Sequence, residues 1–320
     1  MRRFRPLPDG LSARAFSTRD ATQLGVTPDR LRARDLNAPF PGVRTAASPL
    51  TTIEACRAFA PRLRDCDVFS HVTAAQLWRI PLPLHRSGTF PLHVSSEAPA
   101  RAIRVSRVAG HQLEWAPGEV TTLDGLPLSG VALAWCQLGE SLKLPDLIAA
   151  AEFVITGNPY GDLLPLASIH ELRAASMARI GGRGSVVRRQ ALEHAVVGAL
   201  SRPESLLRLL LLSGGIPQPL INVGVTDEHG SFVAMPDLQW PEYQVAMEYE
   251  GDHHREQVRF RRDIRRIEAL VDAGWLVVKA SADDLFVHPD ELVARVIRRL
   301  KSRGWRPTLR DLPKFGPIRP

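Results

Sequence analysis

The sequence predicts an α/β protein of the multidomain α+β kind, and three observations carry this prediction. Its 320 residues exceed the usual size of one domain. Short alternating runs separated by Gly and Pro lie in the middle of the chain, and stretches of helical apolar spacing surround them. The last third shows the order α-β-β-β-α-β, followed by a helix. We expect a helix-turn-helix-like module over 1–50, a mixed α/β middle domain over 51–184, a further domain over 185–304 and a basic tail over 305–320.

The composition is that of a protein with buried cores, 44% hydrophobic and 23% charged. No apolar run approaches the ~18 residues that cross a bilayer, and no apolar stretch follows the basic N-terminus. We therefore expect no membrane partner and no signal peptide. The three scattered cysteines fit a reducing cytoplasm. The net charge of +7 permits an anionic partner such as DNA, although a GC-rich genome produces the same arginine bias.

Residues 16–45 predict two short helices joined by a turn at Gly25. Thr27 can cap the second helix, and Pro28 suits its first position. Helix, tight turn and basic helix form the pattern of a helix-turn-helix, whose second helix enters the major groove. A plain helical hairpin with solvated arginines is the alternative. Under the first interpretation, the residues that contact DNA phosphates are Arg30, Arg32 and Arg34.

The segment 51–200 shows no chemistry in its sequence. We expect a capped helix over 69–78, strands between Phe90 and Leu128, and helices from Val131 onward. The histidines of this segment are isolated along the chain, and an isolated histidine is more typical of a surface or hydrogen-bonded core residue than of a metal ligand. These histidines are His71, His85, His93, His111 and His170.

The last third carries the strongest pattern. Ser201 and Pro203 open a helix that ends at the pair Gly214-Gly215. The elements expected after it are strands over 220–225, 232–238 and 244–249, a long helix over 255–273, a fourth strand over 275–279 and a last helix over 292–300.

Acidic side chains interrupt these apolar elements. Glu204 lies on the first helix, and Asp237 lies near the end of the second strand. Glu248 and Glu250 share one face of the third strand, because strand side chains alternate. Charges in an apolar sheet are costly unless they are paired or bound to metal. Converging carboxylates supply the hard oxygen ligands that Mg²⁺ prefers, and bound Mg²⁺ can activate water and neutralise a phosphate.

Glu204, Pro236-Asp237 and Glu248-Tyr249-Glu250 together resemble the motif of the PD-(D/E)XK nucleases. The resemblance is closest to the Vsr-like (very short patch repair) branch and to a domain of unknown function within it. The runs that carry this closer resemblance are Asp237–Glu242, Glu248–His254, Arg262–Arg266 and Ala273–Trp275. The resemblance implies a restriction-endonuclease-like αβββαβ core and a metal-dependent DNA endonuclease.

The same resemblance assigns roles to individual residues. Asp237 and Glu248 would bind Mg²⁺ or Mn²⁺, Glu204 would support the metal or its water, and His254 would act as general base. Glu250 departs from the motif because it stands at the position of the motif's lysine, for which Lys279 or Arg262 could substitute. Four arginines at helical spacing either follow a phosphate backbone or form a solvated face. These are Arg255, Arg259, Arg262 and Arg266.

The N-terminal part resembles the AbiEi-type antitoxins of type IV toxin–antitoxin systems. The resemblance rests on the helix-turn-helix pattern, Pro41-Gly42-Val43 and Ser70–Ala75. It implies a winged-helix-like module and a partner toxin or defence protein. The sequence thus favours a DNA endonuclease acting in phage defence, DNA repair or a toxin–antitoxin system. The alternatives are a DNA-binding, antitoxin-like regulator with an inactive nuclease fold, and a structural or interaction protein.

Overall fold

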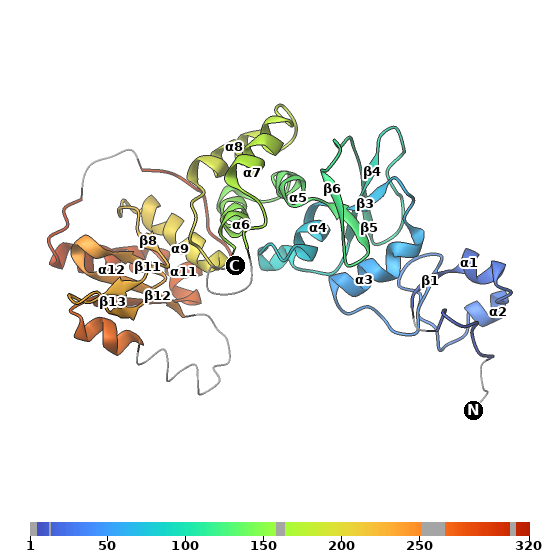
Figure 1. The fold of residues 1–320 in the computed structure, drawn as a ribbon, viewed down its shortest axis with the longest axis horizontal. Helices are drawn as coiled ribbons and strands as arrows, with labels where there is room; N and C mark the ends of the chain where they lie inside the picture. Colours follow the sequence, from blue (N-terminus) through green and yellow to red (C-terminus); the bar gives the residue numbers. More distant parts are fainter. Residues whose placement is uncertain (1–4, 13, 158–163, 251–265, 308–311) are drawn as a thin grey trace. The chain divides into compact units, whose positions relative to one another are not determined.

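The computed structural model describes residues 5–12, 14–157, 164–250, 266–307 and 312–320 of the chain (Figure 1). It mixes helices with several separate β-sheets, as the sequence predicts. The chain divides into two compact units, Met1–Ser141 and Leu142–Pro320. The segment 142–184, expected in the middle domain, therefore lies in the second unit. No helix among the described residues has the length and apolar character needed to cross a bilayer.

The first unit begins with a small helical module. The side chain of Ser17 caps α1 (Thr18–Gln23), and Thr27 caps α2 (Pro28–Leu31), whose first turn holds the expected proline. Strands β1 (Phe16–Ser17) and β2 (Val43–Arg44) pair antiparallel in the same module. The apolar core of the module consists of Leu11, Phe16, Ala21, Val26 and Leu31.

The second helix of this module is shorter than predicted. It ends at Leu31, so Arg32 is its C-cap and Arg34 lies beyond it. The guanidinium of Arg30 donates two hydrogen bonds, of 2.9 and 2.8 Å, to the carboxylate of Asp35, and its side chain is only 10% exposed. Arg32 and Arg34 therefore do not lie within the helix in which they were expected, and Arg30 is paired inside the module.

A five-stranded sheet with the order β5-β4-β3-β7-β6 forms the rest of the first unit. Its strands are β3 (Asp67–Phe69), β4 (Leu92–Glu97), β5 (Val108–Leu113), β6 (Val120–Leu123) and β7 (Leu126–Ser129). The pairs β3–β7 and β4–β5 are parallel, and the pairs β3–β4 and β6–β7 are antiparallel. The core against the sheet includes side chains of α3 (Thr52–Phe59), α4 (His71–Leu77) and α5 (Val131–Leu138). Strands lie between Phe90 and Leu128 as predicted, but the alternating run 103–105, which also suggested a strand, lies outside β4 and β5. Strand β3 was not predicted.

Helices open the second unit. They are α6 (Leu144–Thr156), α7 (Ile169–Met177), α8 (Ser185–His194) and α9 (Arg202–Ser213). Two buried ion pairs join α6 to α9. Glu152 accepts a hydrogen bond from Arg208, and the guanidinium of Arg202 lies 2.8 Å from the carboxylate of Asp146. These pairs attach the segment 142–184 to the second unit.

The second unit contains a four-stranded sheet with the order β13-β12-β11-β8. Its strands are β8 (Leu220–Ile221), β11 (Leu238–Trp240), β12 (Val245–Glu250) and β13 (Leu276–Ser281). Only β12 and β13 run parallel among these pairs. Counted over the strands of this sheet alone, with α9 before β8 and helical residues 266–272 before β13, the order is the predicted α-β-β-β-α-β.

Two of the predicted strands are interrupted. Strands β9 (Val225–Thr226) and β10 (Phe232–Ala234) form a separate antiparallel pair. Pro236, which has no N–H to donate to a ladder, lies between β10 and β11. Asp237 therefore immediately precedes β11 and does not end a longer strand.

Alternating side chains cover the two faces of this sheet with different elements. Val245 and Met247 belong to the core that includes α9, α11 (Ala282–Phe286) and α12 (Pro289–Ser302). Ala246 belongs to a second core with Leu270 and residues of β9 and β10. The sheet therefore lies between two layers, with α9 and α12 beside it in Figure 1.

The residues after α12 pack onto the second unit where the structure describes them. Trp305 is 8% exposed and belongs to the core of the sheet. The ring of Phe315 meets the ring of His194 edge-on, with centroids 4.8 Å apart. The segment expected as a basic tail is therefore partly built into the fold.

Candidate functional site

The predicted acids Asp237, Glu248 and Glu250 lie at one edge of the second sheet. Asp237 immediately precedes β11, and both glutamates lie on β12, on the face of Ala246. The main-chain N–H of Tyr249 donates to Oδ2 of Asp237 at 2.6 Å. This bond holds the aspartate beside the end of β12, so the sheet brings together acids that lie on two strands.

Two cationic side chains accompany these acids. Nη2 of Arg266 lies 2.7 Å from Oε2 of Glu248, which is 3% exposed. Lys279 lies opposite Glu248 in the parallel register of β12 and β13, and its Nζ is 2.8 Å from Oε1 of Glu250. A buried carboxylate is tolerated when a cation pairs with it. Arg266, predicted to contact DNA phosphates, is instead bound to a carboxylate of the same unit.

Glu204 has a different role in the structure. Its Oε1 accepts a hydrogen bond from the Ser201 hydroxyl at 2.7 Å, and its Oε2 accepts from the Leu200 N–H at 2.9 Å. The side-chain amide of Asn222 donates to Oε2 at 2.7 Å, and its main-chain N–H donates to the Asp237 carbonyl at 3.0 Å. Glu204 therefore fixes the start of α9, and Asn222 links it to the acidic edge.

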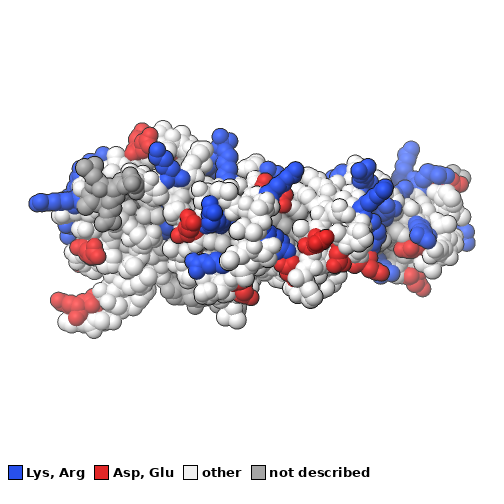
Figure 2. Space-filling model, turned by 90° about the horizontal axis from the view of Figure 1, so that it is seen from above, with Lys and Arg blue, Asp and Glu red and all other residues white. Residues whose placement is uncertain are grey.

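Some of the predicted site residues lie outside the described residues. These are His254, Arg255, Arg259 and Arg262. On the face shown in Figure 2, basic side chains are interspersed with acidic ones. This face therefore carries side chains of both signs.

A second group of side chains lies in the first unit, where the sequence showed no chemistry. His71, His93 and His111 each offer one ligand nitrogen, and these nitrogens lie within 4.8 Å of one another. These three histidines, which are distant from one another along the chain, are therefore neighbours in the fold. His71 begins α4, His93 lies on β4 and His111 lies on β5. The parallel register places Ser95 opposite His111, so His93 is its diagonal neighbour on one face of the sheet.

The three rings are in close contact. The rings of His71 and His111 stack with centroids 3.7 Å apart and planes at 19°. Nδ1 of His93 lies 3.0 Å from Nε2 of His111. Nδ1 of His71 lies 3.0 Å from the hydroxyl of Ser70, which in turn accepts a hydrogen bond from Ser95 at 2.9 Å. The histidines and two buried serines thus form one polar cluster.

The backbone of His71 is unusual. Its φ of 51° is in the left-handed region, although His71 is the first residue of α4. Its N–H donates to the side-chain oxygen of Gln137 at 2.9 Å. Non-glycine residues in this region cost roughly 1–3 kcal/mol and concentrate at functional sites. The conformation places the ring against His111.

Burial determines the protonation of the cluster. It lowers the pKa of His71 to about 3, with further lowering by His111 and His93. It lowers the pKa of His93 to about 4, where His111 and Arg86 add to the effect. Burial also lowers the pKa of His111. All three rings are therefore neutral at neutral pH, which is the form of imidazole that binds metal.

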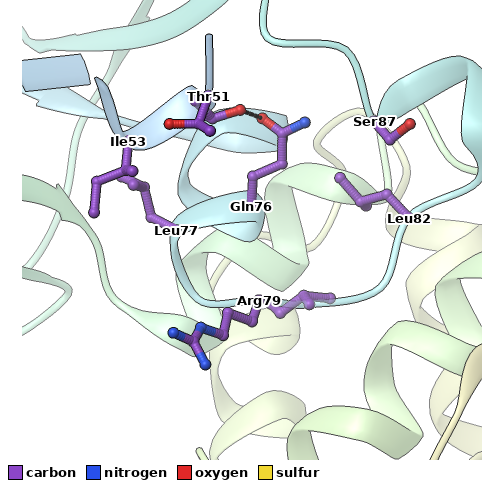
Figure 3. A pocket seen from close by; sticks show the side chains of 9 residues that line it. Thr51, Ile53, Gln76, Leu77, Arg79, Leu82 and Ser87 are labelled. Atoms are coloured by element: carbon purple, nitrogen blue, oxygen red, sulfur yellow. Dashed lines mark hydrogen bonds between the residues drawn. The ribbon is translucent and has the colours of Figure 1, made fainter. Parts of the chain in front are cut away.

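A pocket of about 400 Å³ opens at the other end of α4 (Figure 3). Residues from the start of α3, the end of α4 and the segment after α4 line it. These are Thr51, Thr52, Ile53, Gln76, Leu77, Arg79, Ile80, Leu82 and Ser87. The side chains of Thr52 and Gln76 are joined by a hydrogen bond of 3.0 Å. This lining holds no carboxylate, thiol or imidazole, so the pocket offers a binding surface without an acid–base group.

Comparisons with known proteins relate the chain to two mycobacterial proteins. No known family model matches it, and no solved structure matches it at a significant level. The uncharacterized proteins MT2308 and Rv2248 of Mycobacterium tuberculosis are each 33% identical to it over 205 residues, which is 63% of this chain and 69% of each relative. The chain therefore belongs to the family of these two mycobacterial proteins.

Proposed function

We propose that the second unit is a metal-dependent DNA endonuclease of the PD-(D/E)XK, Vsr-like type, in which Asp237 and Glu248 bind Mg²⁺ or Mn²⁺. The observation that carries the proposal is the adjacency of these two acids. The Tyr249 N–H holds the Asp237 carboxylate at 2.6 Å, next to the residue that bears the buried Glu248 carboxylate. The order α-β-β-β-α-β within the sheet, with one parallel pair, supports the αβββαβ core that the motif resemblance implies.

The donor set fits a hard divalent cation. Mg²⁺ is commonly held by one or two carboxylates, with water and substrate phosphate completing its shell. Asp237 and Glu248 supply two carboxylates at one edge of the sheet. Such an ion, when bound, supplies charge neutralisation at a phosphate and lowers the pKa of a coordinated water. Arg266 bonds Oε2 of Glu248 at 2.7 Å and keeps this carboxylate in place.

Lys279 is our candidate for the cation that the motif places on the third strand. It lies opposite Glu248 on the neighbouring parallel strand, and Glu250 holds its Nζ at 2.8 Å. The side chain is 50% exposed, so it is accessible to a substrate phosphate. A lysine ammonium binds phosphate as a point charge. Lys279 could therefore act from β13, although the motif places its lysine on the strand that here carries Glu250.

The substrate that we propose is DNA, on the motif resemblance and the net charge of +7. The N-terminal module would contribute DNA affinity and contacts to a partner toxin or defence protein, as the antitoxin resemblance implies. Salt-dependent binding without cleavage would instead favour a DNA-binding regulator with an inactive nuclease fold.

Cleavage assays on the full chain test the proposal. Supercoiled, mismatched and single-stranded DNA would be incubated with Mg²⁺ or Mn²⁺, and with EDTA as the metal-free control. We expect Asp237→Asn and Glu248→Gln to abolish metal-dependent cleavage. Glu242→Gln is the matched control because Glu242 is an exposed acid in the turn Pro241–Tyr243, at the other end of β11 and β12. Cleavage by Asp237→Asn at the wild-type rate would overturn the assignment.

A further inference from the structure

We propose that His71, His93 and His111 form a binding site for a divalent transition metal, with Zn²⁺ as the expected ion. The site lies in the first unit and uses none of the acids of the second unit. It therefore does not rest on the nuclease proposal, and the two can fail independently.

The spacing of the nitrogens suits a single ion. Two ligands of a tetrahedral Zn²⁺, each at about 2.0–2.1 Å, lie roughly 3.3 Å apart. Nδ1 of His93 and Nε2 of His111 are 3.0 Å apart, and the three ligand atoms lie within 4.8 Å of one another. Imidazole lone pairs lie in the ring plane, so His71 must tilt from its 19° stacking against His111 to point at the same ion.

Buried hydrogen bonds surround the cluster. The Ser70 hydroxyl contacts Nδ1 of His71 at 3.0 Å, which leaves Nε2 as the nitrogen for an ion. Metal-binding histidines commonly have such a partner on the second ring nitrogen. Ser95 donates to Ser70 at 2.9 Å, and both serines are fully buried. The main-chain N–H of His93 donates to the Thr73 hydroxyl at 2.8 Å and holds the backbone of β4 beside α4.

The donor chemistry selects the class of ion. Imidazole suits Zn²⁺, Cu²⁺ and Ni²⁺, whereas Mg²⁺ prefers oxygen, and this three-member group is built of histidines alone. Three protein ligands leave a fourth position for water, which is the arrangement of catalytic zinc sites. His93 and His111 are only partly buried, so that position can reach solvent.

The test uses the full chain after treatment with EDTA and removal of the chelator. Zn²⁺ would be titrated by calorimetry, and Co²⁺ by its visible d–d absorption, which reports tetrahedral coordination. His93→Phe and His111→Phe keep an aromatic ring in the stack and remove one ligand. His85→Phe is the matched control because His85 is exposed and outside the cluster. Asp237→Asn is the control for binding at the acidic edge.

We expect one Zn²⁺ per chain and a tetrahedral Co²⁺ spectrum for the wild type, for His85→Phe and for Asp237→Asn. The affinity of His93→Phe and His111→Phe should fall roughly 100-fold or more, because even indirect partners of a metal contribute roughly 10- to 100-fold. Thermal unfolding of the metal-free variants checks that they are folded. If His93→Phe is not folded, His93→Gln takes its place. Absence of Zn²⁺ and Co²⁺ binding by the wild type, or wild-type binding by folded ligand variants, would overturn the proposal.

Discussion

The guanidinium of Arg208 donates a hydrogen bond to the carboxylate of Glu152, and the two side chains are 1% and 0% exposed. The pair joins α9 to α6, and the main-chain N–H of Val196 also donates to Glu152 at 3.1 Å. Removing one partner of a buried pair leaves the other charge without compensation. Such a change typically costs about 3–5 kcal/mol.

We therefore expect Glu152→Ala to lower the free energy of unfolding of the second unit by about 3–5 kcal/mol. The surface pair of Arg32 and Asp29, with side chains 67% and 94% exposed, provides the comparison. Asp29→Ala should change stability by less than about 1 kcal/mol, because exposed pairs contribute little. Urea denaturation followed by circular dichroism measures both effects. Equal stability of Glu152→Ala and wild type would contradict the structural role of the pair.

The pair of Arg208 and Glu152 also predicts that two fragments of the chain differ in stability. A fragment of residues 142–320 retains α6, α9 and the C-terminal residues that pack onto the unit, so we expect a cooperative thermal transition. A fragment of residues 185–304 lacks Glu152 and Trp305 and leaves Arg208 buried without its carboxylate. It should be unfolded or aggregate. Cooperative unfolding of the shorter fragment would contradict the division of the chain at Ser141.

The histidine cluster predicts how stability depends on pH in the presence of a chelator. The pKa of His71 is about 3 in the folded protein and 6.5 in an unfolded chain. Below the higher value the unfolded chain binds a proton that the folded protein does not, so stability is complete above about pH 6.5 and falls as the pH decreases toward about 3. Urea midpoints at about pH 7.5, 6 and 5 measure the decrease. His71→Phe should reduce this pH dependence, and an unchanged slope would show that the ring is protonated when folded.

Cysteine labelling tests the core of the first unit. Burial raises the pKa of the Cys56 thiol to about 12, so this thiol stays protonated and inaccessible. Cys66 is only partly buried, and Cys136 is buried. A thiol reagent at mildly alkaline pH should react first with Cys66, and Cys66→Ser should remove this early phase. Modification of Cys56 without unfolding, located by mass spectrometry, would contradict the packing of α3.

Local signals in the sequence predicted much of the fold. Thr27 and Ser201 cap the helices that they were expected to cap, because a side-chain oxygen at this position satisfies a free N–H of the first turn. The face shared by Glu248 and Glu250 follows from strand alternation alone. The apolar run 232–238 predicted one strand. Pro236 has no N–H to donate to a strand partner, and it separates β10 from β11.

Contacts between distant residues were beyond the reach of these signals. The ion pair between Arg30 and Asp35 was not predicted, because Asp35 reaches Arg30 only after α2 has ended. Glu204 was predicted to support a metal ion. Its contact with Asn222, which directly follows β8, was not predicted because the two residues are distant in the sequence. The histidine cluster depends on the parallel pairing of β4 with β5, and no spacing along the chain encodes that register.

Gly110 on β5 limits how the sequence beside the histidine cluster can change during evolution. A Cβ at this position would stand 2.0 Å from the carbonyl oxygen of Ile103, so no other residue fits unless the neighbouring backbone moves. His111 is the next residue on β5, so a shift of the strand away from Ile103 would also shift its ring relative to His71. A substitution at Gly110 would therefore disturb the histidine cluster through the backbone of β5. The clash with Ile103 involves backbone atoms, so it would constrain this position even in a descendant that had lost the rings.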